Sequence, residues 1–229
     1  KSNAAEIQIH TQAFDVGDEK AFLSFKESVL HVFTKVDFVF NNAGVSLVQP
    51  APLLETEDLE WIMRINFWGI VYGTQAFLPE MIKKDSGTII NISSLFGLLG
   101  WPKNAAYCAS KFAVRGFTEA LRLDLFDTKV RLVTVHPGGV RTQIVENARV
   151  AQTIGQNTKT ENAKSQLAKQ FSKIARTTAD QAAQEILNGL KKNKMRILVG
   201  KDAKILDFMQ RLFPEKYVSL LARLTRVKI

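Results

Sequence analysis

The chain has 229 residues, of which 46% are apolar and 23% are charged. This length and composition can bury one full core, so we expect a single domain and exclude a disordered chain. No run of about 18 apolar residues predicts a transmembrane helix. No apolar region follows residues 1–6, as a signal peptide would require.

The net charge of +9 is unevenly distributed along the chain. Residues 1–158 carry 15 basic and 16 acidic side chains, whereas residues 159–229 carry 16 basic and 6 acidic ones. A solvated basic surface is the ordinary interpretation, and a surface that meets anionic lipid is the more specific one. We do not expect nucleic acid as a partner, because no reading motif or aromatic platform accompanies the charge.

The chain has one cysteine, Cys108, which excludes an internal disulfide and is typical of a reducing compartment. We therefore expect a cytoplasmic protein, and the basic C-terminal third leaves membrane association open. His10, His31 and His136 are scattered without the spacing of metal ligands, so we expect no metal site.

Short apolar runs alternate with amphipathic segments along the chain. The apolar runs predict strands at residues 9–14, 36–40, 87–93, 130–136 and 196–199. The amphipathic segments predict helices at residues 18–33, 56–84, 105–127 and 178–192, with N-caps at Asp18, Thr56 and Thr178. Residues 142–173 form a polar stretch with few strand or core signals.

Continuous apolar strands separated by helices favour a Rossmann-like, doubly wound α/β fold, with a parallel sheet covered by helices on both faces. Ligands in such sheets bind at the carboxyl ends of the strands. Asn41, Ser93, Ser94 and Pro137 all fall at those ends, so we expect them to line one crevice.

A phenol and an ammonium four residues apart are the strongest functional signal. Tyr107 and Lys111 would lie one turn apart on a helix, thirteen residues after Ser94. A free tyrosine has a pKa of about 10, and a nearby cation is expected to lower it. Tyr107 could then exchange a proton with an alcohol or ketone, while Ser94 bonds the substrate oxygen.

The motifs Asn41 to Gly44, Ser94, Tyr107-x-x-x-Lys111 and Pro137-Gly138 resemble, in order and spacing, the classical short-chain dehydrogenase/reductase family. Asn66 matches the fourth catalytic position of that family, and the match runs from about residue 9 to residue 199. The resemblance implies an oxidoreductase that moves hydride between NAD or NADP and an alcohol or ketone, without distinguishing the two cofactors. Tyr107 would be the general acid/base, Lys111 would also hold the nicotinamide ribose, and Asn66 would support a water relay to it.

The resemblance also implies cofactor contacts along the strand ends. Asp15 matches the position that contacts the adenine amino group, and residues 137–142 match the segment near the nicotinamide carboxamide. Asn41 to Gly44 would stabilise the central strands and border the cofactor, and Ser93 is expected to be structural. The implied cofactor-binding residues are Asp15, Val16, Asn42, Ala43, Gly44, Tyr107, Lys111, Pro137, Gly138, Val140 and Thr142.

The sequence departs from the family in lacking the Thr-Gly-x-x-x-Gly-x-Gly turn that meets the pyrophosphate, together with the first two strands. We expect that the chain is a piece of a longer enzyme. There are two alternatives. The chain is a natural non-catalytic relative that acts through oligomerisation or membrane contact, or another subunit completes its sheet. On its own the 229-residue chain should bind dinucleotide very weakly, and the strand at 9–14 should lack its neighbour.

Three further expectations concern the surroundings of the site. Leu95, Phe96, Leu98, Leu99 and Trp101 suggest an apolar pocket wall and an apolar carbonyl or alcohol substrate; packing in the core or a subunit interface is the alternative. The helices at 68–84 and 105–127 match the subunit interface of the family, which implies a homodimer or homotetramer. We divide the chain into a catalytic domain at 1–200, with a substrate loop at about 143–175, and a basic amphipathic extension at 201–229.

The extension has apolar residues at helical spacing on both sides of Pro214. Packing against the same or a neighbouring subunit is the ordinary interpretation of these residues. Peripheral contact with a membrane is the more specific one, because basic residues accompany them. The apolar residues are Ile205, Leu206, Phe208, Met209, Leu212, Phe213, Tyr217, Val218, Leu220, Leu221 and Leu224.

Overall fold

The computed structural model describes residues 7–150, 165, 168–169, 171 and 175–225. Its centre is a four-stranded parallel sheet with the order β1-β3-β4-β6. The strands are β1 (Phe38–Asn41), β3 (Thr88–Ile92), β4 (Arg131–Pro137) and β6 (Arg196–Val199). Two short strands, β2 (Leu47–Val48) and β5 (Arg149–Val150), pair in parallel as a separate sheet.

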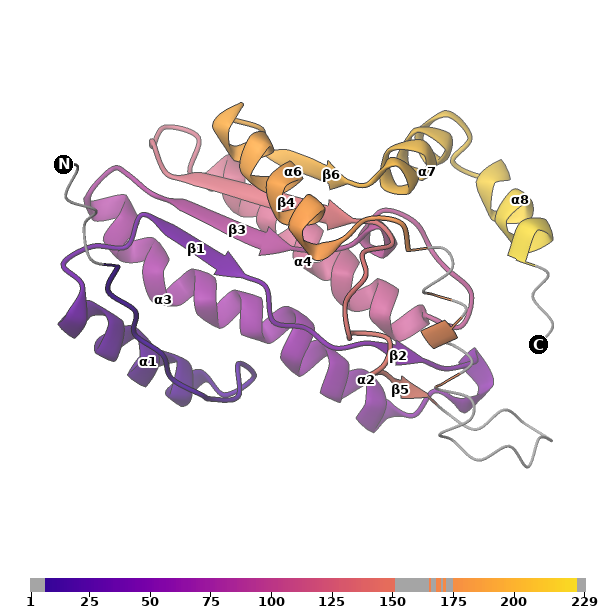
Figure 1. Ribbon diagram of the computed structural model, residues 1–229, viewed down its shortest axis with the longest axis horizontal. Coiled ribbons are helices and arrows are strands. Elements are labelled where there is room, and N and C mark those ends of the chain that lie inside the picture. The colour runs from indigo at the N-terminus through magenta and orange to yellow at the C-terminus, as the bar shows by residue number, and fades with distance from the viewer. Residues whose placement is uncertain (1–6, 151–164, 166–167, 170, 172–174, 226–229) are drawn as a thin grey trace.

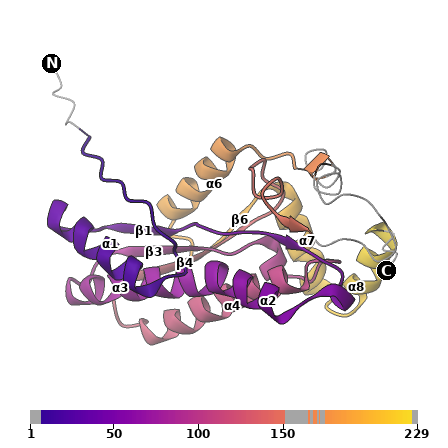
Figure 2. The same ribbon diagram turned by 90° about the horizontal axis from the view of Figure 1, so that it is seen from below.

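Helices cover both faces of this sheet, as the sequence predicts (Figures 1 and 2). In Figure 2, α3 and α4 lie on one side of the strands and α6 lies on the other. The helices are α1 (Glu19–Val32), α2 (Thr56–Met63), α3 (Gly69–Lys83), α4 (Ala105–Asp124), α6 (Ala179–Lys191), α7 (Lys201–Leu212) and α8 (Lys216–Thr225). Short 3-10 turns occur at Ala51–Leu53 and Leu95–Gly97, and one π-helical turn at Arg64–Trp68 joins α2 to α3.

The central strands β3 and β4 are buried on both faces, because successive side chains point to opposite sides of a strand and helices cover both sides. In β3, Ile89 packs into the cluster beneath α3, while Ile90 packs into the cluster beneath α6. Both side chains are fully buried. The unbroken apolar runs in the sequence thus correspond to strands with helices on each side.

Two of the three predicted helix caps are confirmed. The Asp18 carboxylate accepts hydrogen bonds from the first-turn amides of α1. Thr178 forms a reciprocal capping box with Gln181 at the start of α6. The predicted cap at Thr56 is wrong, because α2 already begins at Thr56 and Glu55 is the N-cap, without a side-chain hydrogen bond.

The predicted strand at residues 9–14 is also wrong. Residues 7–14 form no strand, and Ile7 and Ile9 are 84% and 78% exposed. β1 is an edge strand of the described sheet, and its Phe38 and Phe40 are 56% and 47% exposed. A strand needs a neighbour to satisfy its backbone, and residues 7–14 pair with none. Exposed aromatic side chains therefore lie on the edge strand β1.

The polar stretch contains one strand that the sequence did not predict, β5, which pairs with β2. Residues 151–164, 166–167, 170 and 172–174, which make up most of the expected substrate loop, lie outside the described residues.

The C-terminal helices α7 and α8 contact the rest of the molecule through a small apolar cluster. Ala203 of α7 and Leu221 of α8 pack with Leu95 and Leu99, which follow β3. Among the described residues, no helix is long and apolar enough to cross a bilayer.

Candidate active site

Helix α4 places Tyr107 and Lys111 one turn apart at its N-terminal end. Tyr107 is half-buried, and its ring meets the edge of the Phe96 ring at a centroid distance of 6.1 Å. Lys111 is buried, and its Nζ lies 5.9 Å from the centroid of the Tyr107 ring. The ammonium donates a hydrogen bond of 3.0 Å to the carbonyl of Ile92, the last residue of β3. The strand end therefore fixes the position of the cation beside the phenol.

Ser94 follows β3 and is the N-cap of the 3-10 turn at Leu95–Gly97. Its Oγ accepts a hydrogen bond of 3.1 Å from the Phe96 amide, and it is also a hydrogen-bond partner of the Tyr107 hydroxyl. The Ser94 carbonyl lies 3.0 Å from Nδ1 of His136 on β4. Tyr107, Ser94 and Lys111 are thus brought together, as the sequence predicts.

Asn66 lies inside the π-helical turn at Arg64–Trp68 and is fully buried. Its Oδ1 accepts from the Val45 amide at 2.8 Å, and its Nδ2 donates to the Val45 carbonyl at 3.0 Å. Nδ2 also donates to Oγ of Ser110 at 3.1 Å, and Ser110 donates to the Tyr107 carbonyl. Asn66 therefore connects the loop after β1 to the first turn of α4. Single π-helical turns inside helices are often found at functional sites.

The electrostatics of the pair differ from the expectation. Burial raises the pKa of Tyr107 to about 12, and the hydrogen bond from Ser94 opposes this only in part. Burial lowers the pKa of Lys111 to about 8. The sequence predicts that the Lys111 cation lowers the pKa of Tyr107, but in this structure that pKa is raised, because removal of the phenolate from water is the largest cause of the shift.

Asn41 and Ser93 are structural rather than exposed in a crevice. Asn41 is buried, and its Nδ2 donates to Oδ1 of Asn91 at 2.8 Å and to Thr74 Oγ1 at 3.2 Å. Ser93 Oγ donates to the Lys111 carbonyl at 2.8 Å. The expectation that both residues line the crevice is wrong, whereas their predicted supporting roles match these contacts.

The residues after Asn41 lead toward the catalytic side chains. Asn42 and Ala43 are exposed and Gly44 is half-buried. A Cβ atom on Gly44 would lie 3.2 Å from Asn66 Oδ1 and 3.4 Å from Lys111 Nζ. Glycine at this position therefore leaves the space beside the amide and the ammonium open.

The turn after β4 is held from two sides. The Gly138 amide donates to the Val199 carbonyl at 3.0 Å, and the Gly139 amide donates to the Asp202 carboxylate at 2.6 Å. Val140 forms an isolated parallel bridge with Thr177. Thr142 is exposed.

Asp15 and Val16 lie beside the helix that carries Asn66. The Asp15 carboxylate accepts from the Gly17 amide at 2.8 Å and pairs with Arg64 at 2.7 Å. These bonds, led by the one from Arg64, lower the pKa of Asp15. A Cβ atom on Gly69 would touch Val16 at 3.0 Å, which shows that this segment packs closely on the start of α3.

The arrangement fits one end of a nicotinamide dinucleotide. Gly44, Lys111 and the backbone of the turn after β4 lie at strand ends, where a nicotinamide riboside would meet a proton donor. The sequence contains no Gly-x-x-x-Gly-x-Gly turn for the pyrophosphate. The described residues contain no cluster of three or more His, Cys, Asp or Glu side chains suited to a metal ion.

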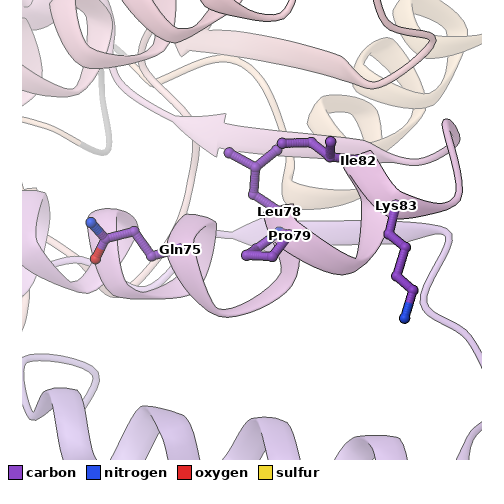
Figure 3. Close-up of a pocket in the computed structure, with 5 residues that line it drawn as sticks. All are labelled: Gln75, Leu78, Pro79, Ile82 and Lys83. Carbon is purple, nitrogen blue, oxygen red and sulfur yellow. The ribbon is translucent and has the colours of Figure 1, made fainter.

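A surface hollow occurs elsewhere, on the outer side of α3 (Figure 3). Its lining comes from this helix alone and includes none of the residues predicted for catalysis: Gln75, Leu78, Pro79, Ile82 and Lys83. Figure 3 shows Lys83 and Gln75 pointing away from the apolar side chains at its centre. It is therefore separate from the candidate active site.

Several residues that position the site were not singled out from the sequence. Ser110, Arg64 and Asp202 are common polar residues whose spacing carries no signal, and their contacts join segments far apart in the chain. Nothing in the local sequence around His136 indicates its contact with the Ser94 carbonyl. An asparagine at position 66 inside an apolar helix was the one local sign of a special role.

Known proteins resemble this chain in sequence and in fold. The family model for short chain dehydrogenase matches residues 1–153. The putative oxidoreductase SadH of Mycobacterium tuberculosis is 39% identical over 224 residues, which cover 96% of this chain and 78% of the relative. A short-chain dehydrogenase/reductase from Burkholderia phymatum, solved in complex with NAD, is 25% identical with a TM-score of 0.77. That match covers 89% of this chain and 75% of the solved one.

A short-chain dehydrogenase from Burkholderia cenocepacia, solved in complex with NADP, shares the fold with a TM-score of 0.69 at 22% identity. The match covers 92% of this chain and 76% of the solved one. The chain belongs to the short-chain dehydrogenase/reductase family, as its motifs predict.

Proposed function

We propose that this member of the family transfers hydride between NAD or NADP and an alcohol or ketone, with Tyr107 as the general acid/base. The observation that carries the proposal is the meeting of Tyr107, Ser94 and Lys111 at the end of β3, braced by Asn66. The two solved relatives, bound to NAD and NADP respectively, support a nicotinamide cofactor without selecting one.

The protonation states favour Tyr107 as an acid in the free site. With a pKa of about 12 the phenol carries its proton at neutral pH, so it is ready to give that proton to a ketone oxygen. Ser94 donates a second hydrogen bond to the same oxygen while negative charge develops there. Lys111, with a pKa of about 8, is mostly cationic at pH 7 and stabilises the phenolate that remains.

The cofactor supplies the chemistry that these side chains lack. When bound, a reduced nicotinamide provides the hydride for the carbonyl carbon, and the oxidised form accepts one from an alcohol. Lys111 would hold its ribose, while Gly44 and the turn at Pro137, Gly138 and Val140 would border the nicotinamide. Asn42, Ala43 and Thr142 would lie along the same crevice, and Asp15 with Val16 would meet the adenine.

Removing the phenol tests this assignment directly. Full-length protein would be assayed with NADH and NADPH, and the wild type compared with Tyr107→Phe. We expect the variant to bind cofactor and lose turnover. Activity that survives the substitution would show that another group moves the proton. A wild type that binds neither cofactor would instead favour the non-catalytic alternative, in which the protein acts through oligomerisation or membrane contact.

We infer an apolar substrate of medium or large size from the walls beside Tyr107. Phe96 and Trp101 are half-buried and stack at 5.2 Å, and Phe96 meets the Tyr107 ring. Leu95, Leu98 and Leu99 are at most 4% exposed, so their main contribution is to the core behind this wall. A substrate panel tests the inference: comparable kcat/KM for small hydrophilic carbonyls would contradict it.

We also propose that the chain forms a homodimer or homotetramer through α3 and α4. Large apolar side chains lie exposed on or beside these helices: Trp68, Ile82, Phe112, Leu123 and Phe126. Exposed apolar area of this kind is typical of an interface. Light scattering at micromolar concentration would reveal the oligomer, and a monomer would contradict the proposal.

The exposed side of α7 favours a second candidate function, peripheral contact with an anionic membrane. Ile205, Phe208 and Leu212 lie on one side of this helix, at 65%, 64% and 55% exposure. On α7, α8 and the turn between them, the exposed charged residues are five basic ones and one acidic one: Lys201, Lys204, Arg211, Lys216, Arg223 and Glu215. An exposed apolar strip among cations is suited to a surface of acidic lipid.

Sedimentation with vesicles of phosphatidylserine and phosphatidylcholine tests this contact. We expect binding at low salt that weakens at least tenfold in the double variant Ile205→Gln, Phe208→Gln. The matched control is Leu187→Gln, which removes an exposed apolar residue of α6. Equal vesicle binding by the double variant and the control would contradict the membrane contact. If the wild type binds no vesicles and the double variant loses its oligomer, the strip belongs to a protein contact.

A further inference from the structure

Asp202, the second residue of α7, contacts the turn that follows β4 although the two are 63 positions apart in the chain. Its Oδ2 accepts a hydrogen bond of 2.6 Å from the Gly139 amide. A hydrogen bond between a backbone amide and a carboxylate is shorter and stronger than one between neutral groups. The first turn of α7 is thereby joined to the end of the central strand β4.

Two glycines, Gly138 and Gly200, make room for this carboxylate. A Cβ atom on Gly138 would collide with it, and one on Gly200 would lie 2.6 Å from Oδ1. A Cβ atom on Gly139 would lie 3.5 Å from Oδ2. Gly200 also has a positive φ of 89°, which residues with side chains rarely adopt. The backbone around Asp202 is therefore shaped to let one carboxylate approach closely.

The same strand end is held on its other side by His136. Nδ1 of this buried imidazole lies 3.0 Å from the carbonyl of Ser94, the residue proposed to bond the substrate oxygen. The Gly138 amide donates to Val199 on β6. The turn after β4 is thus connected to the substrate side through His136 and to the C-terminal helix through Asp202.

We propose that Asp202 is a positioning residue for the cofactor, which holds the turn at Pro137 to Gly139 where it can border the nicotinamide. This inference rests on the proposed function. It makes α7 a structural part of the cofactor site, although α7 carries none of the catalytic residues. The competing explanation is that the carboxylate only stabilises the N-terminus of α7 through the helix dipole.

Substitution in the full-length protein separates the two explanations. Asp202→Ala removes the acceptor, whereas Asp202→Asn keeps an acceptor oxygen and removes the charge. The matched control is Asp180→Ala, because Asp180 is an exposed acid in the first turn of α6. Two quantities would be measured: the Kd for NADH and NADPH by fluorescence titration, and the hydrogen-exchange rate of the amides in residues 138–141.

We expect Asp202→Ala to raise the cofactor Kd about tenfold, because the hydrogen bond to the Gly139 amide is lost and only part of its free energy reaches the ligand. Exchange in residues 138–141 should accelerate as well. Asp202→Asn should stay within about threefold of the wild type, and Asp180→Ala should change neither quantity.

Three outcomes would overturn the inference. An unchanged Kd in Asp202→Ala would remove the cofactor role, even with faster exchange. Equal effects of the alanine and asparagine variants, or of Asp180→Ala, would assign the carboxylate to helix stability. If the wild type binds neither cofactor, the proposed function fails, and the cofactor role of Asp202 fails with it. In that case, unchanged amide exchange in Asp202→Ala would also show that Asp202 does not stabilise the turn after β4.

Discussion

The corner of the molecule that holds Asn66, Tyr107 and Lys111, the candidate active site, and the outer edge of the sheet at β1 are built in opposite ways. At the corner, Asn66 is fully buried and makes three hydrogen bonds, and Lys111 is held by the end of β3. At the edge, Phe38 and Phe40 are half exposed, and residues 7–14 form no strand. The side chains at the corner are held in place by helix geometry and by buried hydrogen bonds. Residues 7–14 form no strand because a strand needs hydrogen bonds to a neighbouring strand.

Loss of the phenol should have the largest effect on the corner. Tyr107→Phe keeps the ring contacts and removes the proton donor, so we expect kcat to fall about 100- to 10,000-fold. The measurement is steady-state turnover of full-length protein, with circular dichroism to confirm the fold. Tyr72→Phe, on α3, should retain wild-type turnover, and an equal loss in both variants would contradict the special role of Tyr107.

The free energy of unfolding should decrease in acid, because His136 is buried beside the corner. Burial lowers the pKa of His136 from 6.5 to about 4. Between these values the unfolded chain binds a proton that the folded protein does not, so stability is full above pH 6.5 and decreases as the pH falls to about 4. The shift corresponds to about 3 kcal/mol.

Urea unfolding at several pH values would measure this decrease. The slope between pH 6.5 and pH 4 should flatten in His136→Asn, since asparagine does not titrate. An unchanged slope in that variant would assign the acid sensitivity to other groups.

Removal of the Asn66 amide should weaken the corner without touching the reacting groups. Asn66→Ala leaves the Val45 amide and carbonyl without their partner, and we expect a loss of about 2 kcal/mol in the free energy of unfolding. Denaturant titration measures it. Asn42→Ala, at an exposed position of the same loop, should cost less than about 0.5 kcal/mol. Similar losses would contradict the bracing role of Asn66.

The smallest effect is expected at the edge. β1 alternates exposed and buried side chains, so Val39→Ala should cost about 1–2 kcal/mol in this chain and Phe40→Ala less than that, although phenylalanine is larger. Thermal unfolding of both variants would measure the difference. A larger loss of stability in Phe40→Ala than in Val39→Ala would mean that another surface covers the Phe40 side chain. The edge would then be as well packed as the corner.

The comparison also explains what the sequence could predict. Ile89 and Ile90 lie in an apolar run that is strong enough to indicate a strand buried on both faces, and the Tyr107-x-x-x-Lys111 spacing places both side chains on one side of a helix. The segment at 9–14 is only half apolar, and its pattern does not show whether a neighbouring strand is present. The raised pKa of Tyr107 depends on burial by Phe96 and the surrounding chain, which local spacing does not contain.

The π-helical turn at Arg64–Trp68 has a consequence for helix phase. An α-helix advances about 100° per residue, and a π turn accommodates one extra residue in the same length. Deleting one residue from this turn would restore regular winding with α2 and α3 in nearly the same phase, but it would displace Asn66 from its position opposite Val45. Insertions and deletions should therefore be far less tolerated here than side-chain changes on the exposed face of the same helix.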